Sequence, residues 1–179
     1  MGFDLTLNDI PHYTYKEYEK WEGDWELIRG IPYAMSPAPN WRHQDFGATF
    51  IQYLKNTLQK NGNCNCLVLY ESDWIVNDDT VVRPDVMIVC EPIEGLHVSR
   101  PPVLILEILS PPSILKDRNT KFHLYQAYGV KYYIIADVDK KQIEVFYLKN
   151  NQYQQLDTLQ FQLTQQCMLE MDLQQLFSL

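Results

Sequence analysis

The sequence predicts an α/β fold whose core follows the order αβββαβ around a mixed central sheet. One long stretch has the apolar spacing of an amphipathic helix, and three β-prone runs follow it. A second helical stretch then leads into another apolar run, which is typical of a buried strand. Short runs on either side predict a flanking N-terminal hairpin and flanking C-terminal strands.

Length and composition indicate one folded domain. The chain has 179 residues, the usual size of a single domain, so we expect one domain over residues 1–179. Hydrophobic residues make up 46% of the chain and aromatic residues 13%, which excludes collagen-like, low-complexity and wholly disordered proteins.

The N-terminal elements are short. Thr14, followed three residues later by Glu17, has the pattern of a capping box, which predicts a helix to about Glu22. Two β-prone runs then meet at a turn around Gly30, and this arrangement predicts a hairpin over residues 25–36.

The core elements come next. Apolar residues at four-residue spacing predict a helix over about residues 43–61, and these residues are Phe46, Phe50, Leu54 and Leu58. Two prolines end the third β-prone run, and the helix behind them is expected to reach about Tyr128. The predicted core strands cover residues 66–71, 81–89, 103–110 and 131–137.

The C-terminal part is rich in glutamine, which alternates with Tyr, Phe and Leu and is therefore expected on solvated strand faces. We predict a strand over 142–148, a hairpin return over 150–158 and a final helical turn over 172–177.

The formal net charge of −8 argues against a protein that coats nucleic acid by bulk electrostatics, but it leaves room for a local site. Eight of the 15 Lys and Arg residues lie within residues 100–149. We expect the basic residues Arg100, Lys116, Arg118, Lys121 and Lys131 to form a local nucleic-acid groove, unless they only line solvated faces.

The four cysteines are too few for the disulfide framework of a small secreted domain, so free thiols in a reducing compartment are expected. Cys64 and Cys66 without a second pair are a weak zinc signal. The sequence has neither a secretory signal pattern nor a run long enough to span a bilayer, which predicts a cytoplasmic protein without membrane contact.

Glu107 is the only charged residue in the apolar run VLILEILS. Desolvation of a lone carboxylate there costs roughly several kcal/mol, unless a cation, a metal ion or hydrogen bonds compensate its charge. Strand alternation places it on one face with Ile105 and Leu109. Asp85 lies near the start of the preceding β-run, within the predicted strand 81–89. If the two strands are neighbours, both acids converge as ligands suited to Mg²⁺ or Mn²⁺.

Lys121 is the candidate third member of this group. On a helix it shares one face with Asp117, Tyr125 and Tyr128. Two interpretations stay open: Lys121 is presented to the two carboxylates, or each charged residue belongs to a structural ion pair, such as Glu107 with Lys121 in the interior.

The runs RPDVMIV, LEILSPPS and DRNTKFHLYQAYGVKYYIIADVD together resemble the Uma-type branch of the PD-(D/E)xK restriction-endonuclease-like superfamily. The segment WELIRGIPYAMSPAPNWRH resembles the N-terminal part of that branch, and the resemblance covers about residues 10–150. Sequence motifs for common nucleotide-binding, hydride-transfer, acyl-transfer and zinc-protease sites are absent.

The resemblance implies that Asp85 and Glu107 are metal-binding acids, with the backbone carbonyl of Ile108 as a third oxygen. The superfamily's lysine would fall at position 109, where this chain has Leu109, and the branch pattern points to Lys121 instead. Glu26 resembles an upstream acid that reaches the metal or a second ion. His43 resembles a family position suited to phosphate contact or proton transfer, although capping or loop roles are the alternative.

The function this implies is that of a Mg²⁺- or Mn²⁺-dependent endonuclease that hydrolyses phosphodiester bonds of DNA. The alternative is a catalytically degenerate module of the same fold, acting in nucleic-acid binding or protein assembly. A homodimer is expected because two copies of one site suit the two strands of a duplex.

Overall fold

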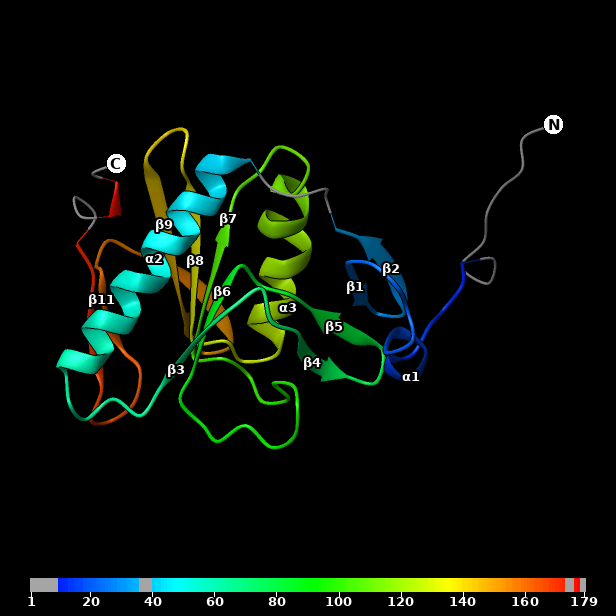
Figure 1. Ribbon diagram of the computed structural model, residues 1–179, viewed down its shortest axis with the longest axis horizontal. Coiled ribbons are helices and arrows are strands. Elements are labelled where there is room, and N and C mark those ends of the chain that lie inside the picture. Colours follow the sequence, from blue (N-terminus) through cyan, green and yellow to red (C-terminus); the bar gives the residue numbers. More distant parts are fainter. Residues whose placement is uncertain (1–9, 36–39, 173–175, 178–179) are drawn as a thin grey trace.

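The computed structural model describes residues 10–35, 40–172 and 176–177, and its centre is a six-stranded sheet with helices on both faces (Figure 1). The strands β7 and β8 are parallel neighbours, and the other neighbouring pairs are antiparallel. In spatial order the strands are β10 (Gln152–Leu156), β9 (Gln142–Lys149), β8 (Tyr132–Asp137), β7 (Leu104–Ile108), β6 (Val86–Val89) and β3 (Leu67–Tyr70).

Each face of this sheet has its own apolar core. Helix α2 (Trp41–Lys60) covers one face with Phe46, Phe50, Leu54 and Leu58, all buried as their spacing predicts. Helix α3 (Phe122–Ala127) covers the opposite face (Figure 1) and is preceded by the π-helical segment η2 (Lys116–Lys121). The predicted αβββαβ core with a mixed sheet is therefore confirmed.

A second, four-stranded sheet lies beside this core (Figure 1). Its strands are β2 (Ile31–Ala34), β1 (Trp25–Ile28), β5 (Thr80–Val82) and β4 (Trp74–Asn77), in that order. The β1–β2 hairpin confirms the predicted turn, in which Arg29 and Gly30 both have positive φ, as a two-residue type I′ connection needs. A Cβ on Gly30 would lie 2.2 Å from the His12 ring, so only glycine fits there.

The helix predicted at the N-terminus is shorter than expected. Thr14 and Glu17 form the predicted capping box, but helix α1 covers only Tyr15–Tyr18 instead of reaching Glu22. Trp21 follows the helix end and packs edge-on against the Tyr13 and Trp25 rings, which gives this segment its own small apolar cluster.

The predicted strand over 81–89 is wrong as one element, because it forms two strands in two sheets. β5 ends at Val82 in the four-stranded sheet, and β6 begins at Val86 in the six-stranded sheet. Pro84 lies at the break, where it has no backbone N–H to continue a ladder. Strand β4, which pairs with β5, was not expected from the sequence.

The expectation of free thiols is also wrong, because the four cysteines form two disulfides, Cys64–Cys167 and Cys66–Cys90. The pairing of Leu67 with Val89 places Cys66 opposite Cys90, a proximity that appears only once the register of β3 and β6 is known. Cys64 is joined to the segment between β11 (Gln160–Gln162) and β12 (Met168–Glu170).

The C-terminal elements agree in part with the prediction. β9 and β10 form the predicted hairpin, whereas the β11–β12 pair beside α2 was not expected. The final helical turn predicted over 172–177 lies partly outside the described residues. In the described part of the chain, no helix is both long enough and apolar enough to cross a membrane.

Candidate active site

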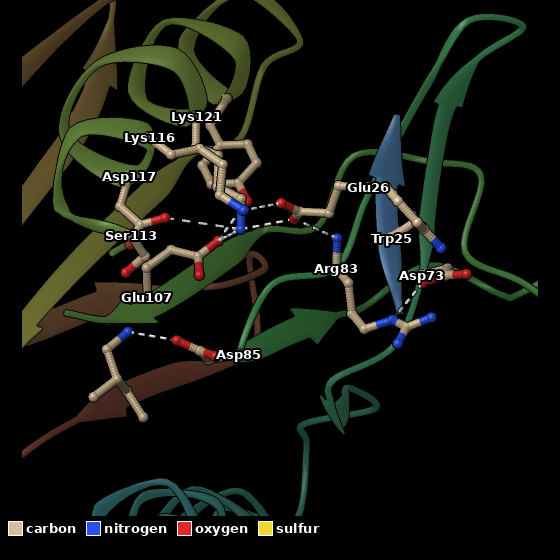
Figure 2. A network of polar contacts seen from close by, with 12 residues as sticks. Trp25, Glu26, Asp73, Arg83, Asp85, Glu107, Ser113, Lys116, Asp117 and Lys121 are labelled. Carbon is tan, nitrogen blue, oxygen red and sulfur yellow. Dashed lines mark hydrogen bonds and ion pairs between the residues drawn. The ribbon is translucent and has the colours of Figure 1, made fainter. Parts of the chain in front are cut away.

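Glu107 points to the face of β7 that α3 covers, as strand alternation predicts. Glu107 is 2% exposed, and its Oε1 accepts hydrogen bonds from Lys121 Nζ at 2.9 Å and Tyr125 Oη at 2.6 Å. Its second carboxylate oxygen points away from Lys121 (Figure 2). Burial raises the pKa of Glu107 well above its ordinary value, while the Lys121 ammonium opposes that rise. The fold thus gives Glu107 partners but leaves its negative charge unfavourable.

Asp85 lies at the break between β5 and β6, next to Glu107 in register. Val86 pairs with Leu106 on antiparallel strands, and continuing that register brings Asp85 opposite Glu107. Opposite residues of an antiparallel pair share one face of the sheet. Asp85 Oδ2 accepts a hydrogen bond from the Ile108 backbone amide at 2.6 Å. The strand adjacency that the convergence of the two acids requires is therefore present.

Lys121 is buried among carboxylates. Its Nζ lies 2.8 Å from Glu26 Oε1, 2.9 Å from Glu107 Oε1 and 3.9 Å from Asp117 Oδ1. Burial alone would lower the pKa of Lys121, but the charges of Glu107, Glu26 and Asp117 outweigh it and raise the pKa well above its ordinary value. The raised pKa favours the ammonium form of Lys121, which donates a hydrogen bond to Glu107 Oε1.

Glu26 belongs to this group from a different sheet. It lies on β1, has no exposed surface, and accepts hydrogen bonds from Lys116 Nζ at 2.5 Å and the Arg83 backbone amide at 2.9 Å. Burial would raise the pKa of Glu26, but Lys121 and Lys116 outweigh it and the pKa is lowered. Three donors thus hold Glu26 in its charged form.

His43 approaches the site from the first turn of α2. The side chain of Asn40 caps this helix by accepting from the His43 backbone amide at 3.1 Å, and His43 Nε2 lies 3.4 Å from Asp85 Oδ2. Burial would lower the pKa of His43, but Asp85 and the Ile108 carbonyl outweigh it and the pKa is raised. Its Nδ1 is buried and has no hydrogen-bond partner among the residues that the structure describes. The structure thus brings all five predicted side chains into one region.

Two further residues of the site, Asp117 and Tyr125, were predicted from the sequence only as neighbours of Lys121 on one helix face. Asp117 is 2% exposed, and within the described part of the chain its buried Oδ1 has no hydrogen-bond partner. Tyr125 is fully buried and contacts Glu107. Both lie four residues from Lys121, so the common helix face was a usable signal. Tyr128, predicted on the same face, instead accepts a hydrogen bond from Asn77 outside the site.

The predicted basic cluster is only partly present, because Lys116 and Lys121 line the site while the other three basic residues make contacts elsewhere. Arg100 is exposed and pairs with glutamates, Arg118 pairs with Glu144, and Lys131 donates to the Gln162 carbonyl. Arg100 and Arg118 thus pair with acids and Lys131 with a carbonyl, contacts that clustering in the sequence does not reveal.

A pocket of about 440 Å³ lies at the site, and Glu26 and Tyr125 are not part of its lining. Its lining includes Asp85, Glu107 and Lys121 together with His43, Lys116 and Asp117. Pro111 and Pro112, which follow β7 in the sequence, form part of the pocket wall. The pocket thus has carboxylates, ammonium groups and an imidazole on one surface.

The donor set of the pocket fits a hard divalent cation. Mg²⁺ is usually held by one or two carboxylates together with water and substrate phosphate. Among the residues that the structure describes, no three His, Cys, Asp or Glu side chains form a ready-made metal cage. Asp85, Glu107 and Asp117 supply carboxylate oxygens to the lining of this pocket, and oxygen ligands are the kind that Mg²⁺ and Mn²⁺ prefer.

The mixed α/β fold of the protein has a counterpart among solved structures. A solved structure described as a putative nuclease belonging to DUF820, from Anabaena variabilis, superimposes with a TM-score of 0.72 over 92% of this chain and 97% of that one. The two sequences are 16% identical, so this likeness concerns the fold.

The sequence defines the family more closely. The model of the Uma2 family, described as putative restriction endonuclease, matches residues 15–179, and the chain therefore belongs to the Uma2 family. No curated protein matches the chain in sequence.

Proposed function

We propose that this protein is a divalent-metal-dependent endonuclease that hydrolyses phosphodiester bonds of DNA. The observation that carries the proposal is that Asp85, directly before β6, and Glu107, on the adjacent strand β7, line one pocket with the buried Lys121. Membership of the Uma2 family supports the nuclease class.

Asp85 and Glu107 would hold Mg²⁺ or Mn²⁺, with the Ile108 carbonyl as a third protein oxygen. When bound, the ion supplies charge for a phosphate oxygen and lowers the pKa of a water molecule. Asp85 makes both of its contacts through Oδ2, and Glu107 makes both of its contacts through Oε1. Each acid thus has a second oxygen that carries none of these contacts.

The side chains of the protein divide the remaining work. Lys121 donates hydrogen bonds to the negative charge that grows on the phosphate, because its raised pKa keeps it protonated. His43 exchanges a proton at Nε2, since imidazole is the pocket group whose ordinary pKa lies nearest neutrality. Glu26 contacts Lys121 and completes the group.

Cleavage of supercoiled plasmid in Mg²⁺ or Mn²⁺ tests the proposal. We expect the wild-type protein to nick or linearise the plasmid and Asp85→Asn to lose at least about a hundredfold in rate, because a metal-binding charge is removed. Asp157→Asn, an exposed aspartate after β10, is the matched control. Equal cleavage by Asp85→Asn and the wild-type protein would overturn the proposal.

The second candidate is a non-catalytic module of the same fold that binds nucleic acid or other proteins. It is favoured by Leu109 at the superfamily's lysine position and by the engagement of Lys121 with both Glu26 and Glu107. Calorimetric titration with Mn²⁺ separates the two. If the protein is a nuclease, it binds Mn²⁺ and Asp85→Asn abolishes this binding. If it is a non-catalytic module, it shows no Mn²⁺ binding that depends on Asp85.

Assembly and location complete the proposal. A two-fold homodimer presents one site to each strand of a duplex, and sedimentation velocity of the purified protein tests it. The proposed location is the cytoplasm. The two disulfides argue against this location, because disulfides are rare in reducing compartments. Trapping thiols in intact cells with an alkylating agent decides this point.

A further inference from the structure

Glu26 is shared by two ammonium groups. Lys116 Nζ contacts its Oε2 at 2.5 Å, and Lys121 Nζ contacts its Oε1 at 2.8 Å. Figure 2 shows the two lysine side chains reaching the same carboxylate from one helical segment. Because one carboxylate carries one negative charge, Glu26 alone does not balance both lysines.

The two lysines differ in their other partners and in their exposure. Lys121 also contacts Glu107 and Asp117, and its side chain is 4% exposed. Lys116 pairs with Glu26 alone among the carboxylates of the described residues, and its side chain is 20% exposed. Both line the pocket. Lys116 is therefore the ammonium group that a molecule in the pocket reaches more easily and that has the fewer carboxylate partners.

The π-helical geometry of η2 brings these two residues together. In an α-helix, residues five apart differ by about 140° around the axis and point in different directions. A π-helix joins residues five apart by hydrogen bonding, which brings them closer to one side of the helix than in an α-helix. Lys116 and Lys121 are the first and last residues of η2. This winding is consistent with the contact of both lysines with Glu26.

We infer that Lys116 is a phosphate-binding residue of the substrate pocket, which contacts a nucleic-acid phosphate beside the one that is cleaved. The inference rests on the proposed nuclease function and adds to it a second cation with a separate task. Lys121 stays within the carboxylate cluster, whereas Lys116 exchanges part of its contact with Glu26 for a phosphate oxygen. Ammonium groups bind phosphate as compact point charges, which needs no planar geometry.

Lys116→Gln is the test, with Lys60→Gln at the exposed far end of α2 as the matched control. The dissociation constant of a fluorescently labelled DNA duplex is measured by anisotropy in EDTA at several NaCl concentrations. We expect Lys116→Gln to weaken binding about tenfold at low salt. Its plot of log Kd against log salt should lose about 0.9 in slope, the value of one phosphate contact on duplex DNA.

Steady-state cleavage supplies the second measurement. Lys116→Gln is expected to raise KM about tenfold with little change in kcat, because a contact that is equal in ground and transition states is removed. Lys116→Arg keeps the charge and should keep the salt slope. If Lys116→Gln does not fold, Glu26→Gln/Lys116→Gln removes the pair together and should show the same loss of slope.

The outcomes separate this inference from the proposed function. If the wild-type protein cleaves DNA and Lys116→Gln retains the wild-type slope and KM, Lys116 is only a structural partner of Glu26 and the inference is wrong. A lowered melting temperature without a change in slope would overturn the inference in the same way. If the wild-type protein neither binds nor cleaves DNA, the proposed function and this inference fall together.

Discussion

The Ile108 backbone amide donates a hydrogen bond to Asp85 Oδ2 at 2.6 Å, so a side chain accepts where a strand carbonyl would ordinarily do so. The β6–β7 ladder ends at the pairing of Val86 with Leu106, and Pro84 prevents its regular continuation. Asp85 thus accepts the hydrogen bond of the last backbone amide of β7, and it also lines the pocket. A structural task and a proposed metal-binding task fall on one carboxylate.

We expect the two tasks of Asp85 to be separable. Asp85→Asn keeps an acceptor oxygen for the Ile108 amide, so in EDTA it should change the free energy of unfolding by less than about 1 kcal/mol. Asp85→Ala leaves that amide without its partner and should cost about 1–3 kcal/mol. Urea unfolding of both variants checks this. Equal losses for the two variants would show that the hydrogen bond is not what Asp85 contributes.

Glu107→Gln should stabilise the metal-free protein at neutral pH. The pKa of Glu107 is raised above its unfolded value of 4.5, so its penalty on the folded state is absent below that value and grows as pH rises through the folded pKa. We expect the variant to melt about 2–4 °C higher near neutrality, corresponding to about 1 kcal/mol. The gain should disappear in acid. Glu22→Gln, an exposed glutamate, is the control.

The opposite result would support a structural ion pair. If Glu107→Gln melts lower than the wild-type protein in EDTA at every pH, the contact with Lys121 outweighs the burial of the charge. Differential scanning calorimetry across pH distinguishes the two cases.

Removal of the Lys121 ammonium should damage both stability and cleavage. Lys121→Met leaves Glu26 and Glu107 buried without the cation between them, and the loss of one partner from a buried pair costs about 3–5 kcal/mol. Urea unfolding measures this loss. Glu107→Gln/Lys121→Met removes the carboxylate that is left without a cation, since Glu26 keeps Lys116, and should recover part of the stability. Full cleavage by the folded Lys121→Met variant would remove Lys121 from the mechanism.

His43 should make the stability depend on pH. Its pKa is raised above 6.5 in the folded protein, so its contribution is fully present below that value and is lost as pH rises through the folded pKa. His43→Gln is therefore expected to lower the free energy of unfolding more at about pH 5.5 than at about pH 8.5. His97→Gln, on an exposed histidine, is the control. A pH-independent difference would contradict the Asp85–His43 contact.

Reduction of the disulfides should destabilise the protein strongly. Cys64–Cys167 spans 103 residues of sequence and Cys66–Cys90 spans 24, and closing such loops contributes typically about 2–4 kcal/mol each. Unfolding in urea with and without a reductant measures the loss. Cys64→Ser/Cys167→Ser and Cys66→Ser/Cys90→Ser assign it to each bridge. Unchanged midpoints, together with four alkylated cysteines in the native protein, would show that the bridges do not form.

The sequence predicted those features that local pattern determines. The four-residue spacing of Phe46 and its partners identified α2, and alternation around Glu107 placed that acid on the correct face. The π-helical winding of η2 was not predictable, because the ion pairs that accompany it come from distant strands. The pairing of Cys66 with Cys90 likewise depends on strand register.

Glu26 shows the same limit from another direction. It reaches Lys121 from a separate sheet, across 95 positions of sequence, and no periodicity of either segment connects the two. The family resemblance placed it near the site but favoured contact with a metal ion. Only the three-dimensional arrangement shows that Lys116, Lys121 and the Arg83 amide surround its carboxylate.

The four-stranded sheet joins β1 and β2, before α2, to β4 and β5, after it. A shortened chain that starts at α2 would keep every strand of the six-stranded sheet. It would still lose Glu26, the buried carboxylate that contacts both Lys116 and Lys121. Fragments chosen by the outline of the αβββαβ core alone would therefore fold around an incomplete centre, and any study of minimal length must retain the first hairpin.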